Sequence, residues 1–375
     1  MRDLALVINL GSSSLKVALL DANGTSIQQS IHQLEAHASL PDVLQGWLEP
    51  LLEPLRKRIE LIAHRVVHGG DHFTAPTLIT PDLEATLQEL VPLAPLHNPP
   101  ALKGLHWAKR WAPDRPQWAC FDTAFHSTLP IAASTYALPA ELRDQGFRRF
   151  GFHGINHQHV AEVVSAQWQD NGKATEHLRL ISAHLGAGAS LAAVKGNRCI
   201  DTTMGYTPLE GLVMASRSGS IDPGLMLELM RRGWSEVELG NLLQTESGLR
   251  GLSGFSDDMR ELRHQASQGN GGAQLAIDVF RHRLLQLIGS MAASLEGMDV
   301  LALTGGIGEH DTELHSELQQ ALKWVPDLEM VVVPADEEGM MARLCRRRSA
   351  EHQLSLDPAG QESGEADDSV ADGRH

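Results

Sequence analysis

The segment VINLGSSSLKV, residues 7–17, predicts the first unit of the fold. Both ends have the apolar and β-branched character of strands, and Gly11 with the serines after it marks a turn between them. The tip of such a hairpin presents hydroxyls, backbone N–H groups and the ammonium of Lys16, which are groups that bind phosphate. An ordinary hairpin turn without a ligand explains the segment equally well.

This turn is not a Walker loop. The pattern GxxxxGK[ST] occurs nowhere in the chain, and Lys16 enters a strand rather than a helix. A later Gly-rich turn, Thr304–Glu309, follows an apolar strand and could let a flat ring or a phosphate lie on bare backbone. It contains no GxGxxG pattern, which disfavours a Rossmann dinucleotide site.

Outward from the hairpin, apolar strand-like runs alternate with helical patterns, which predicts an α/β fold. A long helix is expected over Gln274–Glu296, with one core-facing stripe that includes Leu275, Leu284 and Ile288. The expected strands are Leu4–Asn9, Leu61–His68, Trp118–Phe121, Leu178–His184, Val300–Thr304 and Met330–Pro334.

Length and charge limit the classes of protein to which this chain can belong. The 375 residues allow about two domains. The 31 basic and 47 acidic residues give a formal charge of −16, which argues against binding to nucleic acid or to an anionic membrane. No apolar run approaches the ~18 residues of a membrane span, and the first ten residues do not resemble a signal peptide, so we expect a cytoplasmic protein.

The cysteine spacing and the acidic carboxyl-terminal segment each lead to a structural expectation. The three cysteines form no CxxC pattern, which predicts reduced core residues rather than a disulfide framework or a zinc site. Residues 349–375 hold seven acids against one arginine, a net charge of −6. A segment so poor in apolar residues predicts an acidic disordered tail.

Two strand ends carry candidate functional residues. Alternation along the run from Leu61 places Arg65 and Val67 on one face, so that a guanidinium lies beside a small apolar wall. Asp122 directly follows the strand that ends at Phe121, where α/β sheets bind ligands, although an aspartate there is also a common turn former.

Histidine spacing leaves a metal site open as an alternative. His64, His68 and His72 share helical spacing, but the intervening glycines and β-branched residues argue against a helix. His153 and His157 could bind zinc if helical, yet no HExxH pattern or third ligand follows. Three further Gly-rich turns, residues 150–157, 184–190 and 216–224, allow close approach of backbone to an anion.

In order and wording, the motifs of this chain resemble those of the acetate kinase family, within the ASKHA superfamily of acetate and sugar kinases, Hsp70 and actin. The resemblance extends from Leu4 to about Arg343. Its motifs are NLGSSSLK (9–16), HRVVHGG (64–70), LAPLHNPP (93–100), FDTAFH (121–126), GFHG (151–154), MGYTPLEGL (204–212), SGSIDPG (218–224), ESGLRGLSG (246–254), TGGIGE (304–309) and VPADEE (333–338).

The resemblance implies a two-domain ASKHA fold with a central cleft. The amino-terminal domain would span residues 1–124, completed by about 336–348, and the carboxyl-terminal domain would span 125–335. The second domain would hold the nucleotide and a homodimer interface. The implied reaction is reversible transfer of the γ-phosphoryl group of ATP to acetate, giving acetyl phosphate and ADP, with Mg²⁺ as cofactor and Mn²⁺ as an alternative metal.

The resemblance also implies roles for residues. Arg65, Arg217 and His153 would hold the carboxylate and the transferred phosphoryl group, and Asp122 would orient acetate or help to place the metal. The pocket for the methyl group would comprise Val67, Leu96, Phe152 and Pro208, with His97 nearby, and the metal would lie at Glu337 and Asn9. The implied nucleotide-binding residues are Ser12, Ser14, Lys16, His184, Leu185, Gly186, Ala187, Gly188, Asp258, Met259, Arg260, Gly305, Gly306, Ile307 and Gly308.

Several positions depart from the family pattern. Ala187 and His310 stand where asparagine is usual, Ile155-Asn156 replaces a commoner Thr-Ser, and Ser220 stands where many members have aspartate. The stretch from Glu309 to Val331 is also shorter than usual. A propionate or butyrate kinase, a nucleotide-binding relative with reduced turnover, and a histidine-bound zinc hydrolase therefore remain as alternatives to acetate kinase.

Overall fold

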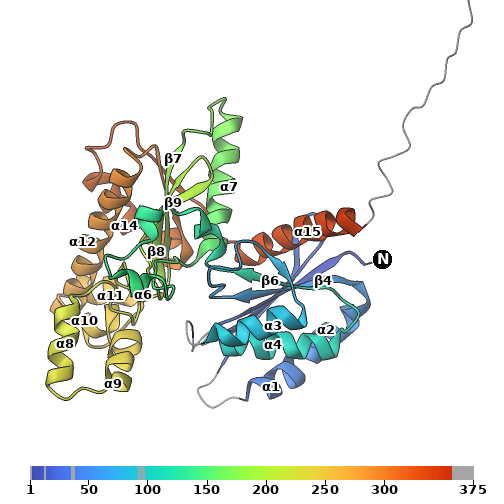
Figure 1. Cartoon of the computed structure of the whole chain (residues 1–375). Helices are drawn as coiled ribbons and strands as arrows, with labels where there is room; N and C mark the ends of the chain where they lie inside the picture. Colours follow the sequence, from blue (N-terminus) through green and yellow to red (C-terminus); the bar gives the residue numbers. More distant parts are fainter. Residues whose placement is uncertain (1, 12–13, 35–38, 92–93, 95–97, 357–375) are drawn as a thin grey trace, which may run out of the picture.

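The computed structural model describes residues 2–11, 14–34, 39–91, 94 and 98–356. Two β-sheets, each covered by helices, form two lobes that lie side by side in Figure 1. The α/β alternation expected from the sequence is confirmed, and a strand is found at each of the six expected places.

The first sheet has six strands in the order β3-β2-β1-β4-β6-β5. Strands β1, β4 and β6 are parallel neighbours, and the other pairs are antiparallel. The hairpin at the start of the chain is confirmed, with Leu10 opposite Leu15 and Ile8 opposite Val17. The strands are β1 (Leu4–Leu10), β2 (Ser14–Leu20), β3 (Ser26–Gln33), β4 (Ile59–Val66), β5 (Thr77–Leu78) and β6 (Gln117–Phe121).

Helices cover both faces of this sheet. On one face, Trp107 and Trp111 pack with the apolar side chains of β1 and with Leu44 and Leu48. On the other face, Met341 and its neighbours in the last helix pack against Ala5 and Val7. The helices of this lobe are α1 (Leu40–Val43), η1 (Leu44–Leu48), α2 (Glu49–Leu52), η2 (Glu53–Arg58), α3 (Pro81–Glu89), α4 (Asn98–Trp111) and α15 (Glu337–Leu356).

Helix α15 corrects one expectation. Residues 349–356, which the sequence places in a disordered tail, continue this helix to Leu356. Arg346 fixes the helix to the first sheet, because its guanidinium donates to the carbonyl of Leu20 at 3.1 Å and pairs with Glu60 at 3.4 Å. The rest of the expected tail, residues 357–375, lies outside the described residues.

The second sheet has five strands in the order β11-β10-β7-β8-β9. Its strands are β7 (Arg179–Leu185), β8 (Ala189–Lys195), β9 (Arg198–Thr202), β10 (Val300–Thr304) and β11 (Glu329–Val332). Helix α7 (Gly154–Asp170) buries Val160 and Val164 against one face of the sheet. Helix α12 (Gly271–Ser294) buries Phe280 and Ile288 against the other.

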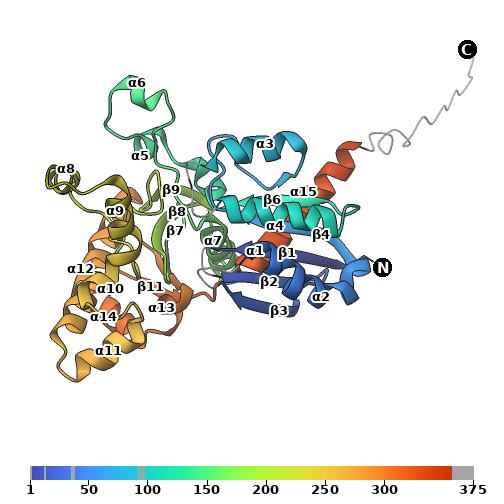
Figure 2. The same ribbon diagram turned by 90° about the horizontal axis from the view of Figure 1, so that it is seen from below.

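The second lobe carries several shorter helices, which Figure 2 shows from below. They are η4 (Ala124–Thr128), α5 (Ile131–Ser134), α6 (Ala140–Arg143), α8 (Pro223–Arg231), α9 (Glu236–Asn241), η5 (Leu242–Glu246), α10 (Gly248–Ser253), α11 (Met259–Ser267), α13 (Gly305–His310) and α14 (Thr312–Ala321). Helix α7 contacts β6 of the first sheet and β7 of the second, and so joins the lobes.

The long helix expected over 274–296 is confirmed as α12, and its buried stripe is confirmed at Leu284 and Ile288. The stripe is wrong at Leu275, which is 51% exposed. At this end of the helix, Ala276, Ile277 and Phe280 form the core face instead.

Two other findings concern the whole described chain. All three cysteines are buried and free, as expected. Among the described residues, no helix is both long and apolar enough to cross a membrane.

Candidate active site

Two parallel strands bring Arg65 and Asp122 together. In the register of β4 and β6, Val66 lies opposite Phe121, so that Arg65 and Asp122 lie at the same edge of the sheet. The Arg65 guanidinium donates to both carboxylate oxygens of Asp122, with Nη2–Oδ2 at 2.6 Å and Nε–Oδ1 at 3.0 Å. Asp122 is only 1% exposed, so this is a buried, bidentate ion pair.

Asn9 extends this pair to the start of α15. Its carboxamide oxygen accepts from Arg65 Nη1 at 3.1 Å. Its nitrogen donates to Glu337 Oε2 at 3.2 Å and to Glu338 Oε1 at 2.9 Å. The two glutamates are more than 320 residues away in the sequence, and the packing of α15 on the first sheet places them here.

The charges of this network support one another. Burial alone would lower the pKa of Arg65, but the nearby carboxylates of Asp122, Glu337 and Glu338 raise it, so the guanidinium stays charged. Burial raises the pKa of Asp122, and the positive charge of Arg65 acts in the opposite direction. Burial also opposes ionisation of Glu337, yet Arg65, His184 and Lys16 together lower its pKa.

The glutamates offer the hard oxygen donors that Mg²⁺ prefers. Glu337, Glu338 and the Asp122 carboxylate all lie around Arg65, and Glu337 is held ionised. In this arrangement the amide nitrogen of Asn9, not its oxygen, faces the glutamates. No group of three or more His, Cys, Asp or Glu side chains arranged for metal binding is present in the described part of the chain. The donor chemistry therefore fits Mg²⁺ through the glutamates, with Asn9 holding them in place.

A close backbone contact between Gly154 and Asp122 positions the opposite side of the site. The N–H of Gly154 donates to the carbonyl of Asp122 at 2.8 Å, and any Cβ at position 154 would collide with that carbonyl. His153, just before it, takes a left-handed backbone conformation with φ of 55°. This backbone contact therefore places the His153 ring near the Arg65–Asp122 pair, at the point where α7 begins.

Neutral imidazoles form this side of the site. His153 stacks on His184 with ring centroids 4.3 Å apart, and His184 Nδ1 lies 2.8 Å from the Asn156 amide nitrogen. Burial lowers the pKa of His153 well below its usual range, and the charges of Arg65 and Arg217 add to the effect. Burial likewise lowers the pKa of His184. These rings can donate or accept a proton in a hydrogen bond without carrying charge.

Arg217 differs from Arg65. Its recorded hydrogen bond is a long one, from Nη1 to the carbonyl of Pro208 at 3.4 Å, and no ion pair with an acidic side chain is found for it among the described residues. Burial lowers the pKa of Arg217, and the charge of Arg65 lowers it further. A half-buried guanidinium without a carboxylate partner is suited to bind an anion.

The predicted methyl pocket is assembled in part. Val67 and Phe152 belong to one apolar cluster, and Phe152 lies 5.5 Å from His68, ring centroid to ring centroid. Pro208 contributes its carbonyl to Arg217. Leu96 and His97 lie outside the described residues. Of the four predicted apolar residues, Val67 and Phe152 are thus buried in one cluster.

A second cavity is lined by seven of the fifteen predicted nucleotide residues. This cavity of about 640 Å³ lies in the second lobe. Seven of the predicted residues line it: Gly186, Ala187, Asp258, Met259, Arg260, Gly306 and Ile307. A Cβ on Gly306 would meet nothing within 4 Å, so the backbone there is open to a ligand.

The remaining predicted nucleotide residues lie elsewhere. Leu185, Gly305 and Gly308 are buried beneath the cavity wall. Ser14 and Lys16 lie on β2, and Lys16 and His184 are close enough to Glu337 to shift its pKa. Gly186 donates its N–H to the Gly188 carbonyl at 3.0 Å, so that N–H is not free for a phosphate. Ser12 lies outside the described residues.

Sequence reasoning missed several residues. Arg263 shapes the 640 Å³ cavity and pairs with Asp311 at 3.1 Å and Glu317 at 2.9 Å. Ser182 and Ser190 hold His157 through both ring nitrogens, at 2.8 Å each. The spacing of His157 suggested only a zinc ligand, and these contacts leave neither of its nitrogens free for a metal. Serines within apolar strands gave no signal of this role.

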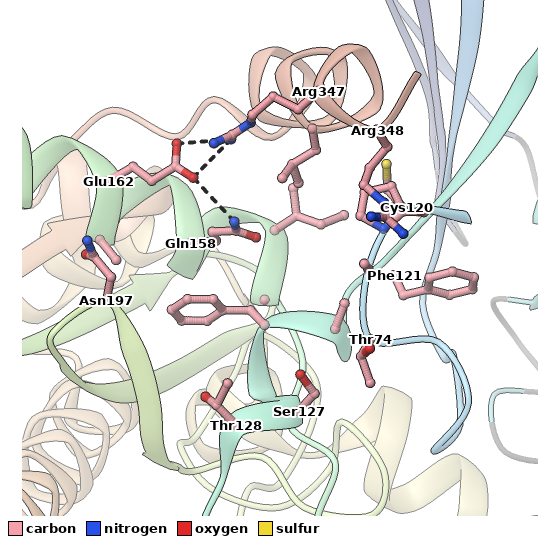
Figure 3. Close-up of a pocket in the computed structure, with 18 of the residues that line it drawn as sticks. Thr74, Cys120, Phe121, Ser127, Thr128, Gln158, Glu162, Asn197, Arg347 and Arg348 are labelled. Atoms are coloured by element: carbon pink, nitrogen blue, oxygen red, sulfur yellow. Dashed lines mark hydrogen bonds and ion pairs between the residues drawn. The ribbon is translucent and has the colours of Figure 1, made fainter. Parts of the chain in front are cut away.

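Figure 3 shows a different cavity, of about 410 Å³, between α7, α15 and the end of β6. In it, Arg347 pairs with Glu162 at 3.0 Å, and Cys120 and Phe121 line one side. None of the predicted site residues lines this cavity. We therefore do not assign the reaction to it.

The structure thus has two α/β lobes, a guanidinium-rich site between them and an open cavity in the second lobe. The chain belongs to the acetokinase family, whose model matches residues 29–334. It is 43% identical over 345 residues to the acetate kinase of Synechococcus sp. (strain JA-2-3B'a(2-13)), a match that covers 83% of this chain and 85% of that protein.

Solved structures agree with this family. Porphyromonas gingivalis acetate kinase superposes with a TM-score of 0.81 at 32% identity, covering 91% of this chain and 98% of that one. A propionate kinase from Francisella tularensis gives 0.82 at 34% identity with the same coverage. A ROK family protein from Streptococcus pneumoniae, at 14% identity and a TM-score of 0.51 over 92% of this chain and 99% of that one, shares the fold alone. The expected ASKHA architecture is confirmed.

Proposed function

We propose that this chain is an acetate kinase that transfers the γ-phosphoryl group of ATP reversibly to acetate, forming acetyl phosphate and ADP. The observation that carries the proposal is the Arg217 guanidinium, which lies near Arg65 and His153 without a carboxylate partner in the described structure. Such a group can hold the oxygens of a small anion, and the apolar cluster that contains Val67 and Phe152 would receive its methyl group.

Acetate matches this acceptor site in both of its parts. Its carboxylate would lie on Arg217, and its methyl group would occupy the apolar side formed by Val67 and Phe152. Because acetate is already ionised near neutral pH, the reaction needs no strong base. Asp122 is then best suited to holding Arg65 in place through its bidentate ion pair.

The transferred phosphoryl group develops charge on its equatorial oxygens, which requires positive or hydrogen-bonding groups around it. Arg65 and Arg217 supply two guanidiniums, and the neutral ring of His153 supplies a third donor. A bound Mg²⁺ would neutralise further charge on the phosphate oxygens. Glu337 and Glu338 would hold it, with Mn²⁺ as a possible substitute because it accepts the same oxygen ligands.

ATP would bind in the 640 Å³ cavity of the second lobe. The open backbone at Gly306 would face the adenosine, and Lys16 would reach the phosphates from β2. Ala187 in the cavity wall offers only a methyl group where a carboxamide could have donated to a phosphate. ATP metabolism is a cytoplasmic activity, and we propose that location for this chain.

The proposal is tested by measuring acetyl phosphate formation from a panel of donors and acceptors. ATP, GTP and pyrophosphate are each combined with acetate, propionate and butyrate, with and without Mg²⁺. We expect the highest kcat/KM for ATP with acetate, and no turnover when Mg²⁺ is removed by a chelator. Folded protein that binds ATP but forms no acyl phosphate would instead support the relative with reduced turnover.

A propionate kinase is the second candidate. The propionate kinase of Francisella tularensis matches this chain as well as the acetate kinase structure does. One methylene in an apolar pocket changes specificity by only about 1–3 kcal/mol. The ratio of kcat/KM for acetate and propionate in the same panel distinguishes the two.

We also propose that two copies of this chain form a dimer through the second lobe. Helix α8 has no buried residue, although Leu227 is 59% and Met230 is 57% exposed. Val237, at the start of the neighbouring helix α9, is 72% exposed. A second copy would cover this apolar face. Light scattering should give a dimer mass for the native chain and a monomer mass for a Leu227→Glu, Met230→Glu double variant.

A further inference from the structure

Four side chains in the second lobe form a continuous row of hydrogen bonds that ends at His153. Ser182 Oγ lies 2.8 Å from His157 Nδ1, and His157 Nε2 lies 2.8 Å from Ser190 Oγ. Ser190 Oγ in turn lies 2.9 Å from His153 Nδ1. Adjacent strands β7 and β8 supply the serines, and α7 supplies His157.

The first three members of the row are sealed from water, and neither histidine carries a charge. Ser182, Ser190 and His157 are each 0% exposed. Burial lowers the pKa of His157 well below its usual range, with a smaller effect from His126 and His184, and burial does the same for His153. Each neutral ring then has one nitrogen that donates and one that accepts.

Three arrangements of the hydrogens are consistent with these contacts, and the third, in which both histidines donate to Ser190, leaves the Ser190 hydroxyl without an acceptor among the described residues. In the first, Ser182 donates to His157 Nδ1, His157 Nε2 donates to Ser190, and Ser190 donates to His153 Nδ1. In the second, every bond runs the other way, and the Ser182 hydroxyl then needs another acceptor. None is found for it among the described residues. A buried hydroxyl without an acceptor is unfavourable, so the first arrangement is preferred.

The preferred arrangement determines which nitrogen of His153 carries its proton. Nδ1 accepts from Ser190, so the hydrogen lies on Nε2. That nitrogen makes no hydrogen bond within the described structure and is not among the polar atoms sealed from solvent. It faces the site, because a Cβ built on Gly188 would lie 3.0 Å from it and 3.9 Å from Arg217 Nη1.

We propose that Ser182, His157 and Ser190 are positioning residues that fix His153 as the Nε2–H tautomer, so that its ring donates a hydrogen bond to the transferred phosphoryl group. The proposal rests on the proposed function for what His153 contacts, but the tautomer itself is a property of the resting protein. The opposite tautomer would turn a lone pair toward the phosphoryl oxygens and repel them.

The first test reads the tautomer directly, without turnover. Full-length protein labelled with ¹⁵N in its histidine rings is studied by NMR near neutral pH, and the His153 and His157 signals are assigned by their loss in His153→Gln and His157→Gln. We expect both rings to be protonated at Nε2 and unprotonated at Nδ1. In Ser190→Ala, His153 should become a mixture of tautomers.

Ser165→Ala is the matched control. Ser165 lies on the same helix as His157, is also buried, and donates to Asn197 at 2.6 Å, away from the row. This variant should leave the His153 and His157 signals unchanged. If Ser190→Ala does not fold, Ser182→Ala serves instead, and His157 should then show mixed tautomers.

The second test is kinetic. Since His153 donates to a group that develops charge in the transition state, Ser190→Ala should lower kcat about 10-fold and leave KM for ATP and acetate unchanged. A native His153 protonated at Nδ1, or tautomers that the serine variants do not alter, would overturn the proposal. A preserved tautomer pattern in a protein without acetate kinase activity would instead refute the proposed function alone.

Discussion

The two sides of the site stabilise their polar side chains in different ways. On the side of the first sheet, Arg65 is held by Asp122 and Asn9, and Asn9 in turn is held by two glutamates. On the side of the second sheet, neutral imidazoles and serines make the contacts, and Arg217 has no acidic partner in the described structure. The first side therefore surrounds its guanidinium with acidic side chains, whereas the second has a positive charge without an acidic partner.

This difference indicates which side of the site contributes to stability and which side binds substrate. A buried charge is stable only when it is paired, so the network around Arg65 is as much a structural element as a reactive one. Arg217 and the His153 ring keep their binding capacity for a substrate. The prediction is that changes on the first side affect both stability and turnover, while changes on the second affect turnover alone.

Asp122→Asn should have the largest effect. The substitution keeps the size of the side chain but removes the charge that orients Arg65, and we expect kcat to fall by about 10³. Glu337 and Glu338 still face Arg65, so the protein should fold. Acetyl phosphate formation and a thermal melt of the same sample measure both effects. A well-folded variant with near-normal kcat would exclude a catalytic contribution from Asp122.

Arg65→Ala and Arg217→Ala test the comparison directly. Both should lower kcat by about 10², because each removes positive charge from the phosphoryl path. Arg65→Ala leaves Asp122 buried without its partner and should cost about 3–5 kcal/mol of unfolding free energy. Arg217→Ala leaves no buried acid unpaired and should change stability by less than about 1 kcal/mol. Denaturant unfolding of both variants is the measurement, and equal losses of stability would remove the distinction.

Two adjacent residues on β4, His64 and Arg65, respond differently to burial, and this difference predicts that stability depends on pH. Arg65 stays charged at a half-buried position, whereas burial lowers the pKa of its neighbour His64 to about 4, despite a hydrogen bond with Gln117. Below pH 6.5 the unfolded state binds a proton that folded His64 does not, so stability falls as the pH falls from about 6.5 to 4. The loss should reach about 3 kcal/mol for this residue.

His64→Gln is the variant for this test. It removes the titrating group while keeping a polar side chain for Gln117, so unfolding free energy should depend less steeply on pH between about 4 and 6.5. Denaturant titrations at several pH values measure the slope. Equal slopes for the native chain and the variant would show that His64 takes up its proton in the folded state.

Val67→Ala should have the smallest effect of the series. Val67 is 7% exposed and packs in the cluster of Phe152, and the substitution opens about two methyl groups of space there. We expect the kcat/KM ratio of propionate to acetate to rise about 10-fold. An unchanged ratio would place Val67 in the core rather than against the acyl group.

The sequence by itself determined much of this protein. Alternation and turn residues predicted the hairpin at Gly11 and all six expected strands, because these patterns reflect local backbone preferences and which side faces a core. Motif order identified the family, and seven of the predicted nucleotide residues do line one cavity. Where a pattern was ambiguous, as at Leu275 and residues 349–356, the expectation was wrong.

Only the tertiary structure decided which polar groups meet. Glu338 reaches Asn9 across 329 residues because α15 packs on the first sheet, and no local pattern contains that contact. Ser182 and Ser190 read as ordinary strand residues, yet the pairing of β7 with β8 and the packing of α7 bring both to His157. Hydrogen bonds and ion pairs act over a few ångströms in space, so their partners are determined by the packing of sheets and helices and not by separation along the chain.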